Sequence, residues 1–252
     1  GLKPSCIVLV ATVRALKSHG GVAKADLAQE NLPALEKGLS NLTRHLHNIR
    51  TVWGVEPVVA LNRFTSDTDA EIALVREAAA RMGAPVALCE VGAKGGEGGK
   101  ALAEEVVRLA EDPTNDHFQF VYDVEDTIEN KLNAIATKVY RADGVTITAA
   151  AKKQIQQLTE LGFDKMPICM AKTQYSFSDD PSQLGAPTGF TVTVRNLKVC
   201  AGAGHIVAPT GDIITMPGLP QGPSAAKCNV LATALPPRLV PWHRPQTTAL
   251  PV

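Results

Sequence analysis

The chain is 252 residues long, enough for one large or two ordinary domains with a buried core. It carries 25 basic and 25 acidic residues, so its net charge is zero and we expect neither nucleic acid nor a membrane surface as its partner. No apolar run approaches the roughly 20 residues of a membrane-spanning helix and no signal-peptide pattern opens the sequence, so we expect a cytoplasmic protein.

A strand, a helix and a second strand are expected in the first quarter of the chain. The continuous apolar run Ile7–Ala11 is typical of a parallel strand covered on both sides, with residues 12–21 as the loop at its carboxyl end. Residues 58–61 form the next buried strand, which predicts a right-handed βαβ unit in a parallel sheet. Between the strands, one apolar stripe on a helix that Asn31 caps is formed by Leu32, Leu35, Leu39, Leu42, Leu46 and Ile49.

The next segment combines a capped helix, a strand and a glycine-rich loop. Thr68 followed by Glu71 is the pattern of a capping box at the start of a helix. Val86–Cys89 reads as a strand, and the glycine-rich residues 94–99 lead into a helix over residues 100–109. Such a loop binds an anion through free N–H groups, or its glycines only let the backbone turn.

The second half of the chain predicts two further amphipathic helices and two strands. One helix carries Ile128, Leu132, Ile135 and Val139. The other carries Ala151, Ile155, Leu158 and Leu161 and ends at Gly162. Ile168–Ala171 is a buried strand, and residues 190–199 alternate like one half-exposed strand. Alternating helices and strands of this kind indicate an α/β fold built from parallel-sheet βαβ layers.

The segment after the strand Ile168–Ala171 is the most informative loop. Residues 172–180 bring hydroxyls, an amide, two adjacent carboxylates and two aromatic rings together at the carboxyl end of a strand, where α/β proteins bind ligands. The alternative is a solvated turn in which Asp179 and Asp180 precede Pro181.

The cysteines and histidines do not predict a metal site. The five cysteines are far apart in the sequence without zinc-ligand spacing, and Cys6, Cys89 and Cys169 are expected as small core side chains. His45 and His47 are two residues apart on a helix and cannot share a face.

Six segments, in this order, carry a family resemblance. They are ATVRALKSHGG from residue 11, ENLPALEKGLSNLTRHLHNI from residue 30, NRFTSDT from residue 62, AKGGEGG from residue 93, AKTQYSFSDDP from residue 171 and GDIITMPGLP from residue 211. They resemble formate–tetrahydrofolate ligase, also called formyltetrahydrofolate synthetase. The resemblance implies an ATP-dependent ligase with a P-loop-NTPase-like fold that activates formate as formyl phosphate and formylates tetrahydrofolate to 10-formyltetrahydrofolate. It also implies magnesium with ATP, activation by a monovalent cation, and a homotetramer.

The resemblance also implies site residues. Phe64 would stack on adenine, although Phe64 alone would be read as a core aromatic. A second stacking aromatic, common in the family just ahead of the glycine-rich loop, is replaced here around Gly92, a change that would weaken adenine binding about tenfold or more. The implied adenine site comprises Asn62, Phe64, Gly92, Lys94, Gly95 and Gly96. The implied folate cleft comprises Arg14, Lys172, Thr173, Gln174, Tyr175 and Ser176. Arg14, and after it Lys17, suit a phosphate or a polyglutamate folate at the carboxyl end of the first strand, or else both are solvated surface cations. Catalytic roles are not assigned.

The family's GxxxxGK[ST] phosphate loop does not occur in the 252 residues. We therefore expect the carboxy-terminal half of a ligase, truncated on its amino-terminal side, whose missing half is supplied in cis or in trans. Residues 1–66 would be the remnant of the nucleotide-binding α/β domain, residues 67–227 a carboxy-terminal α/β domain, and residues 228–252 a mobile proline-rich tail. Alternatively, the chain is a silent folded remnant or an oligomerisation module, or a nucleotide-binding α/β protein of other chemistry.

Overall fold

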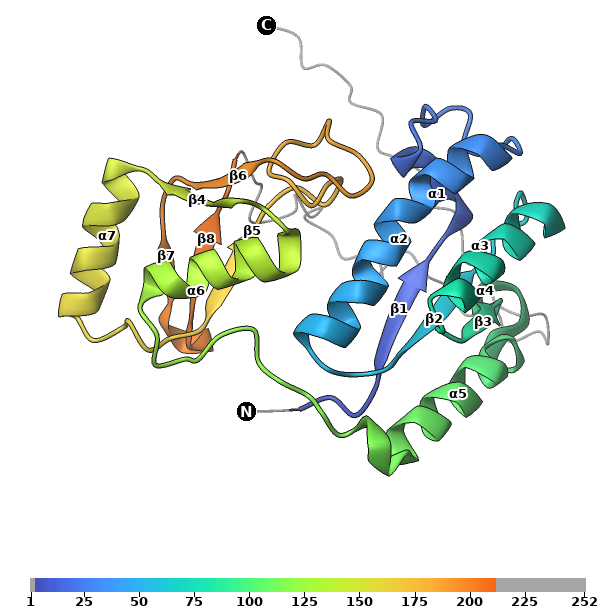
Figure 1. Ribbon diagram of the computed structural model, residues 1–252, viewed down its shortest axis with the longest axis horizontal. Helices are drawn as coiled ribbons and strands as arrows, with labels where there is room; N and C mark the ends of the chain where they lie inside the picture. The colour runs from blue at the N-terminus through green and yellow to red at the C-terminus, as the bar shows by residue number, and fades with distance from the viewer. Residues whose placement is uncertain (1–2, 212–252) are drawn as a thin grey trace, which may run out of the picture. The chain divides into compact units, whose positions relative to one another are not determined.

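The computed structural model describes residues 3–211, which form a mixed α/β structure with parallel sheets (Figure 1). The expected tail, Cys228 and almost all of the segment from residue 211 lie outside these residues. In the described part of the chain, no helix has the length and apolar character needed to cross a membrane.

The first sheet contains three parallel strands in the order β1-β2-β3. Helices α1, α2 and α3 pack against it around a core of leucine, valine and alanine side chains, and α5 contacts β2 and β3 (Figure 1). The elements of this half are β1 (Ile7–Ala11), α1 (Val13–His19), α2 (Leu32–Val52), β2 (Pro57–Asn62), α3 (Asp69–Arg81), β3 (Val86–Cys89), α4 (Val91–Lys94), a 3₁₀ helix (Gly95–Gly99) and α5 (Lys100–Glu111).

Local sequence signals explain most of these boundaries. The Asn31 side chain accepts a hydrogen bond from Ala34 N at 3.0 Å and so caps α2. Thr68 and Glu71 form the predicted capping box of α3. The predicted strands Ile7–Ala11 and Val86–Cys89 and the parallel βαβ pairing are confirmed.

Two expectations for the start of the chain are wrong. Residues 12–21 are not only a loop, because the Thr12 side chain caps the short helix α1. Strand β1 is not covered on both sides: Val8 is 39% and Val10 65% exposed. β1 is an edge strand in this sheet, so its apolar run reflects both core residues and an open face.

The second half contains two smaller sheets. β4 and β6 pair in parallel, while β8 pairs in parallel with β5 and antiparallel with β7. The core between these sheets and helices α6 and α7 includes Leu132, Ala151, Val194 and Ile206. The elements are a 3₁₀ turn (Pro113–Asn115), α6 (Ile128–Ala134), a π-helix (Ile135–Tyr140), β4 (Gly144–Ile147), α7 (Ala149–Glu160), β5 (Ile168–Ala171), β6 (Thr191–Val194), β7 (Lys198–Cys200), a 3₁₀ turn (Ala201–Ala203) and β8 (His205–Pro209).

Here the strand Ile168–Ala171 is confirmed, and three finer expectations fail. Residues 190–199 form β6 and β7 in different sheets instead of one strand. Leu161 lies outside the core and is 68% exposed, because α7 ends before it. Cys169 is exposed, because it faces away from the core that buries its neighbour Ile168.

The domain boundary expected after residue 66 remains a prediction. It falls between β2 and α3, and β3 beyond it pairs with β2 in the same sheet.

Candidate functional site

Three segments with predicted site residues follow β1, β2 and β3. Because parallel strands end at the same edge of a sheet, these segments are neighbours. Arg14 lies in the first turn of α1, and its guanidinium carbon is 5.4 Å from the ring centroid of Phe64 beyond β2. A guanidinium at this distance makes a cation–π contact. The structure thus joins a residue predicted for the folate cleft with one predicted for the adenine site.

Phe64 is held in a tight turn with its ring partly free. Its backbone N–H donates to Asp67 Oδ2 at 2.8 Å, and Asp67 N donates to Phe64 O at 3.0 Å. The Phe64 side chain is 39% exposed, so the interpretation as a buried core aromatic is wrong. Asp67 is 5% exposed, and its Oδ1 has no hydrogen-bond partner in the described residues. The turn therefore exposes the Phe64 ring, whereas Asp67 Oδ1 is buried inside it.

The segment after β3 is linked to the same turn by Glu90. Lys94 Nζ lies 2.5 Å and the Arg63 guanidinium 3.8 Å from its carboxylate oxygens. The hydrogen bond from Lys94, assisted by the charges of Lys94 and Arg63, lowers the pKa of Glu90. Lys94 therefore already has an anionic partner and is not a free phosphate ligand.

Three glycines of this segment lie on the surface. A Cβ atom built on Gly92, Gly95 or Gly96 would meet no heavy atom within 4 Å, and only Gly95 has a positive φ, of 59°. Gly92, Gly95 and Gly96 therefore leave open space beside the turn that carries Phe64. Asn62, the last residue of β2, is partly buried and pairs in register with Cys89.

The five residues predicted after β5 divide into two groups. Lys172 Nζ donates to the carbonyl oxygens of Thr173 at 2.9 Å, Ser178 at 3.3 Å and Ser176, and lies 5.1 Å from the ring centroid of Tyr140. Burial lowers the pKa of Lys172 to about 8, against the opposing charge of Asp179. Lys172 and the buried Ser176 hold the loop together.

The outer group is available to a ligand. Gln174 is exposed and Tyr175 is 59% exposed, whereas Thr173 is partly buried. These side chains form the outer surface of the loop whose interior Lys172 organises.

This loop is attached to α1 and α2 by contacts that the sequence did not reveal. Gly185 N donates to His19 Nδ1 at 3.2 Å, and Asn41 Nδ2 donates to Gly185 O at 2.9 Å. The rings of His45 and Phe177 lie 4.5 Å apart, with Phe177 buried. The apolar stripe predicted for α2 does not include His45, and no sequence signal paired His45 with Phe177.

His45 makes the stability of this attachment depend on pH. Burial, aided by the positive charges of His19 and Lys172, lowers the pKa of His45 to about 4 from 6.5. The unfolded chain therefore binds more protons between pH 6.5 and 4, so the contribution of His45 is complete above pH 6.5 and is lost as the pH falls toward 4.

We expect His45→Phe to flatten the pH dependence of unfolding between pH 4 and 6.5, by an amount on the order of 3 kcal/mol at most. Urea unfolding across this range measures it. His47→Phe is the matched control, because His47 is exposed on the same helix. An unchanged pH profile in His45→Phe would contradict the assignment.

Two cavities lie elsewhere in the structure. One of about 420 Å³ lies at the end of α2, and one of about 1010 Å³ is lined mainly by aromatic and aliphatic side chains of Trp53, Phe118, Phe120, Val121, Tyr122, Val124, Ile135, Val139, Tyr140, Ile168 and Met170. None of the sequence-predicted site residues lines either cavity. Within residues 3–211, no group of three or more histidine, cysteine or acidic side chains is arranged to hold a metal ion.

Comparison with protein families adds one finding to this geometry. A family model described as formate–tetrahydrofolate ligase matches residues 1–234. The match covers both halves of the described structure and every candidate site residue.

Proposed function

Because this chain belongs to the formate–tetrahydrofolate ligase family, we propose that it forms part of an ATP-dependent ligase of one-carbon metabolism. In this reaction formate takes the terminal phosphoryl group of ATP to give formyl phosphate, and ADP leaves. A nitrogen of tetrahydrofolate then attacks the formyl carbon and displaces phosphate, giving 10-formyltetrahydrofolate.

The observation that carries this proposal is the partly exposed ring of Phe64 at the carboxyl edge of the first sheet. Its contact with Arg14 and its place beside the exposed glycine segment give a base a face to stack on. In this proposal Asn62, Gly92, Lys94, Gly95 and Gly96 complete the adenine side.

The folate side is formed by Arg14 and the outer residues of the loop after β5. Gln174 and Tyr175 contact the pterin or its tail, Thr173 lines the wall, and Lys172 and Ser176 position the loop from inside. Catalytic groups are not assigned to this chain.

The phosphate end of ATP requires groups from a further segment of a P-loop-NTPase-like ligase. None of the 252 residues forms a GxxxxGK[ST] motif, so we propose that the chain alone turns over no substrate. The phosphate loop, with its magnesium ion, would come from an amino-terminal half in cis or in trans. A homo-oligomer in the cytoplasm and activation by a monovalent cation complete the proposal.

Nucleotide binding tests the adenine site. Phe64→Ala is expected to weaken ADP binding about tenfold or more, because stacking of one base on an aromatic ring contributes about 1–3 kcal/mol. Isothermal titration calorimetry measures the affinity. Leu161→Ala is the matched control, because Leu161 is also an exposed large apolar side chain, at 68%, and belongs to none of the proposed sites. Equal affinities of the two variants would contradict the role of Phe64.

Turnover tests the reaction. The chain is assayed for ATP- and formate-dependent formylation of tetrahydrofolate, alone and mixed with a polypeptide that carries the phosphate loop. We expect product only in the mixture. Turnover by the chain alone would contradict the phosphate-loop argument, and a mixture that associates without turnover would contradict the ligase proposal.

The second candidate is a silent module of the same family that keeps its fold and subunit contacts. It is favoured by Gly92, which leaves the second side of the adenine site without a ring. Absence of ADP binding to the chain, alone and in the mixture, together with intact assembly would select this candidate.

A further inference from the structure

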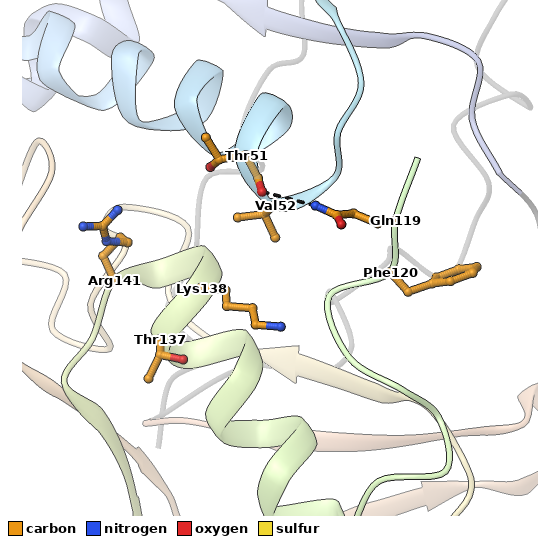
Figure 2. Close-up of a pocket in the computed structure, with 7 residues that line it drawn as sticks. All are labelled: Thr51, Val52, Gln119, Phe120, Thr137, Lys138 and Arg141. Carbon is orange, nitrogen blue, oxygen red and sulfur yellow. Dashed lines mark hydrogen bonds between the residues drawn. The ribbon is translucent and has the colours of Figure 1, made fainter. Parts of the chain in front are cut away.

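The cavity of about 420 Å³ lies at the carboxyl end of α2. Figure 2 shows the residues around it, which come from the last turn of α2, from the π-helix and the residue after it, and from the extended segment before α6, with the Arg141 and Lys138 side chains on different sides. The lining contains two cations and no acidic residue. The lining residues are Thr51, Val52, Gln119, Phe120, Thr137, Lys138 and Arg141.

The positive charge at this cavity is not balanced by the protein. Within residues 3–211, the side chains of Arg141 and of nearby Arg44 have no ion pair and no hydrogen bond. Burial lowers the pKa of Arg44, and the positive charge of Arg141 lowers it further, so the two arginines repel each other. Lys138 Nζ donates to the Val121 carbonyl at 2.8 Å, and its remaining N–H groups are free to donate.

The backbone at this point is unusual in two ways. Residues Ile135–Tyr140 form a π-helix, a conformation that is rare and frequent at functional sites. Arg141 has φ 61° and ψ 31°, and it is the one non-glycine residue with positive φ in the part of the chain that the structure describes. Glycine is the usual residue at such a helix end, so arginine lowers stability here while it adds a charge.

The neutral polar groups of the cavity are already engaged as donors. Thr51 Oγ1 donates to His47 O and Thr137 Oγ1 to Asn133 O, each at 2.8 Å. Gln119 Nε2 donates to Thr51 O at 3.3 Å (Figure 2). Apart from the second N–H of Gln119 Nε2, the free donors are therefore those of the cations, which suit a charged acceptor better than a sugar or an alcohol.

We propose that this cavity binds a small oxyanion with at least two negative charges, a phosphate or a dicarboxylate, through Arg141 and Lys138, with Arg44 adding to the field. The site is distinct from the proposed nucleotide site. It lies at the end of α2 remote from Asn31, and a 21-residue helix is about 30 Å long. Volumes from about 300 Å³ are typical of small-molecule sites, and this cavity falls in that range.

The test is calorimetric titration of the full chain with inorganic phosphate and, separately, with succinate, at low ionic strength and with sodium chloride as control. Arg141→Gly is the central variant, because glycine adopts the same backbone conformation without strain. We expect this variant to melt at the same or a higher temperature while its affinity for the bound anion falls about tenfold or more. Arg44→Met is expected to weaken binding less. Lys153→Met is the matched control, an exposed lysine on α7.

The outcomes distinguish a phosphate-bearing ligand from a dicarboxylate, and either of these from the absence of an anion site. Saturable binding of phosphate alone assigns a phosphate-bearing ligand, and binding of succinate alone assigns a dicarboxylate. Binding of neither probe, binding no stronger than that of chloride, or equal weakening in Lys153→Met overturns the proposal. None of these results depends on turnover by the ligase.

Discussion

Replacing Lys17 with methionine is expected to lower the free energy of unfolding by about 3–5 kcal/mol, because it leaves a buried carboxylate without its cation. Lys17 Nζ lies 2.8 Å from Glu71 Oε1, and both side chains are 0% exposed. Lys17 also donates to Gln29 O at 2.7 Å. Glu71 in turn accepts from the backbone N–H groups of Asn31 and Thr68, at the starts of α2 and α3. One buried ion pair thus joins three helices.

The same pair makes stability sensitive to acid. Burial by itself would raise the pKa of Glu71, but the hydrogen bonds from Lys17, Asn31 and Thr68 and the charge of Lys17 outweigh it and lower the pKa below 4.5. The contribution of Glu71 is therefore complete above pH 4.5 and is lost as the pH falls through its lower folded-state pKa.

The loss of stability in Lys17→Met is measured by urea unfolding of four proteins: the wild type, Lys17→Met, Glu71→Leu and the double variant. The double variant should recover much of the loss, because no isolated charge remains. Arg81→Met is the matched control: Arg81 and Glu77 are also 2.8 Å apart but 59% and 68% exposed, so we expect a change below about 1 kcal/mol. A loss in Lys17→Met no larger than in Arg81→Met would contradict the assignment.

Lys17 and Glu71 also show what the sequence reveals. The capping box was predictable because Thr68 and Glu71 are three residues apart and its geometry is local. The second role of Glu71 was not, because Lys17 reaches it only after the sheet has formed. Lys17 therefore appeared as a candidate for an anion or for solvent, whereas it is a buried structural cation.

In the candidate site, too, some features were predictable from the sequence and others depend on the folded chain. The neighbourhood of Arg14, Phe64 and the glycine segment follows from parallel strands ending at one edge, which the apolar runs predicted. The inward position of Lys172 depends on carbonyl groups that a folded loop brings together. Residues 190–199 were predicted as one strand because β-propensity continues through them, although the chain passes from one sheet to another there.

Gly38→Ala is expected to destabilise the protein by about 3 kcal/mol or more, at the upper end of overpacking effects. A Cβ atom at Gly38 would lie 1.8 Å from Leu16 O, and one at Gly20 would lie 1.9 Å from Ala34 O. Helices α1 and α2 therefore meet backbone against backbone. Leu16 O is fixed because it accepts the hydrogen bond of Gly20 N at 3.0 Å.

Whether Gly38→Ala raises or lowers the free energy of unfolding distinguishes packing from helix propensity. Gly38 lies inside α2, where alanine is ordinarily more stable than glycine by about 1 kcal/mol. Thermal or urea unfolding measures the change, and Gly92→Ala is the matched control, expected to stay within about 0.5 kcal/mol because its Cβ atom meets open space. A stabilised Gly38→Ala variant would show that the helices do not touch here. Since α1 also carries Arg14, separation of the helices would move Arg14 away from Phe64, so a destabilised Gly38→Ala variant should also bind ADP more weakly.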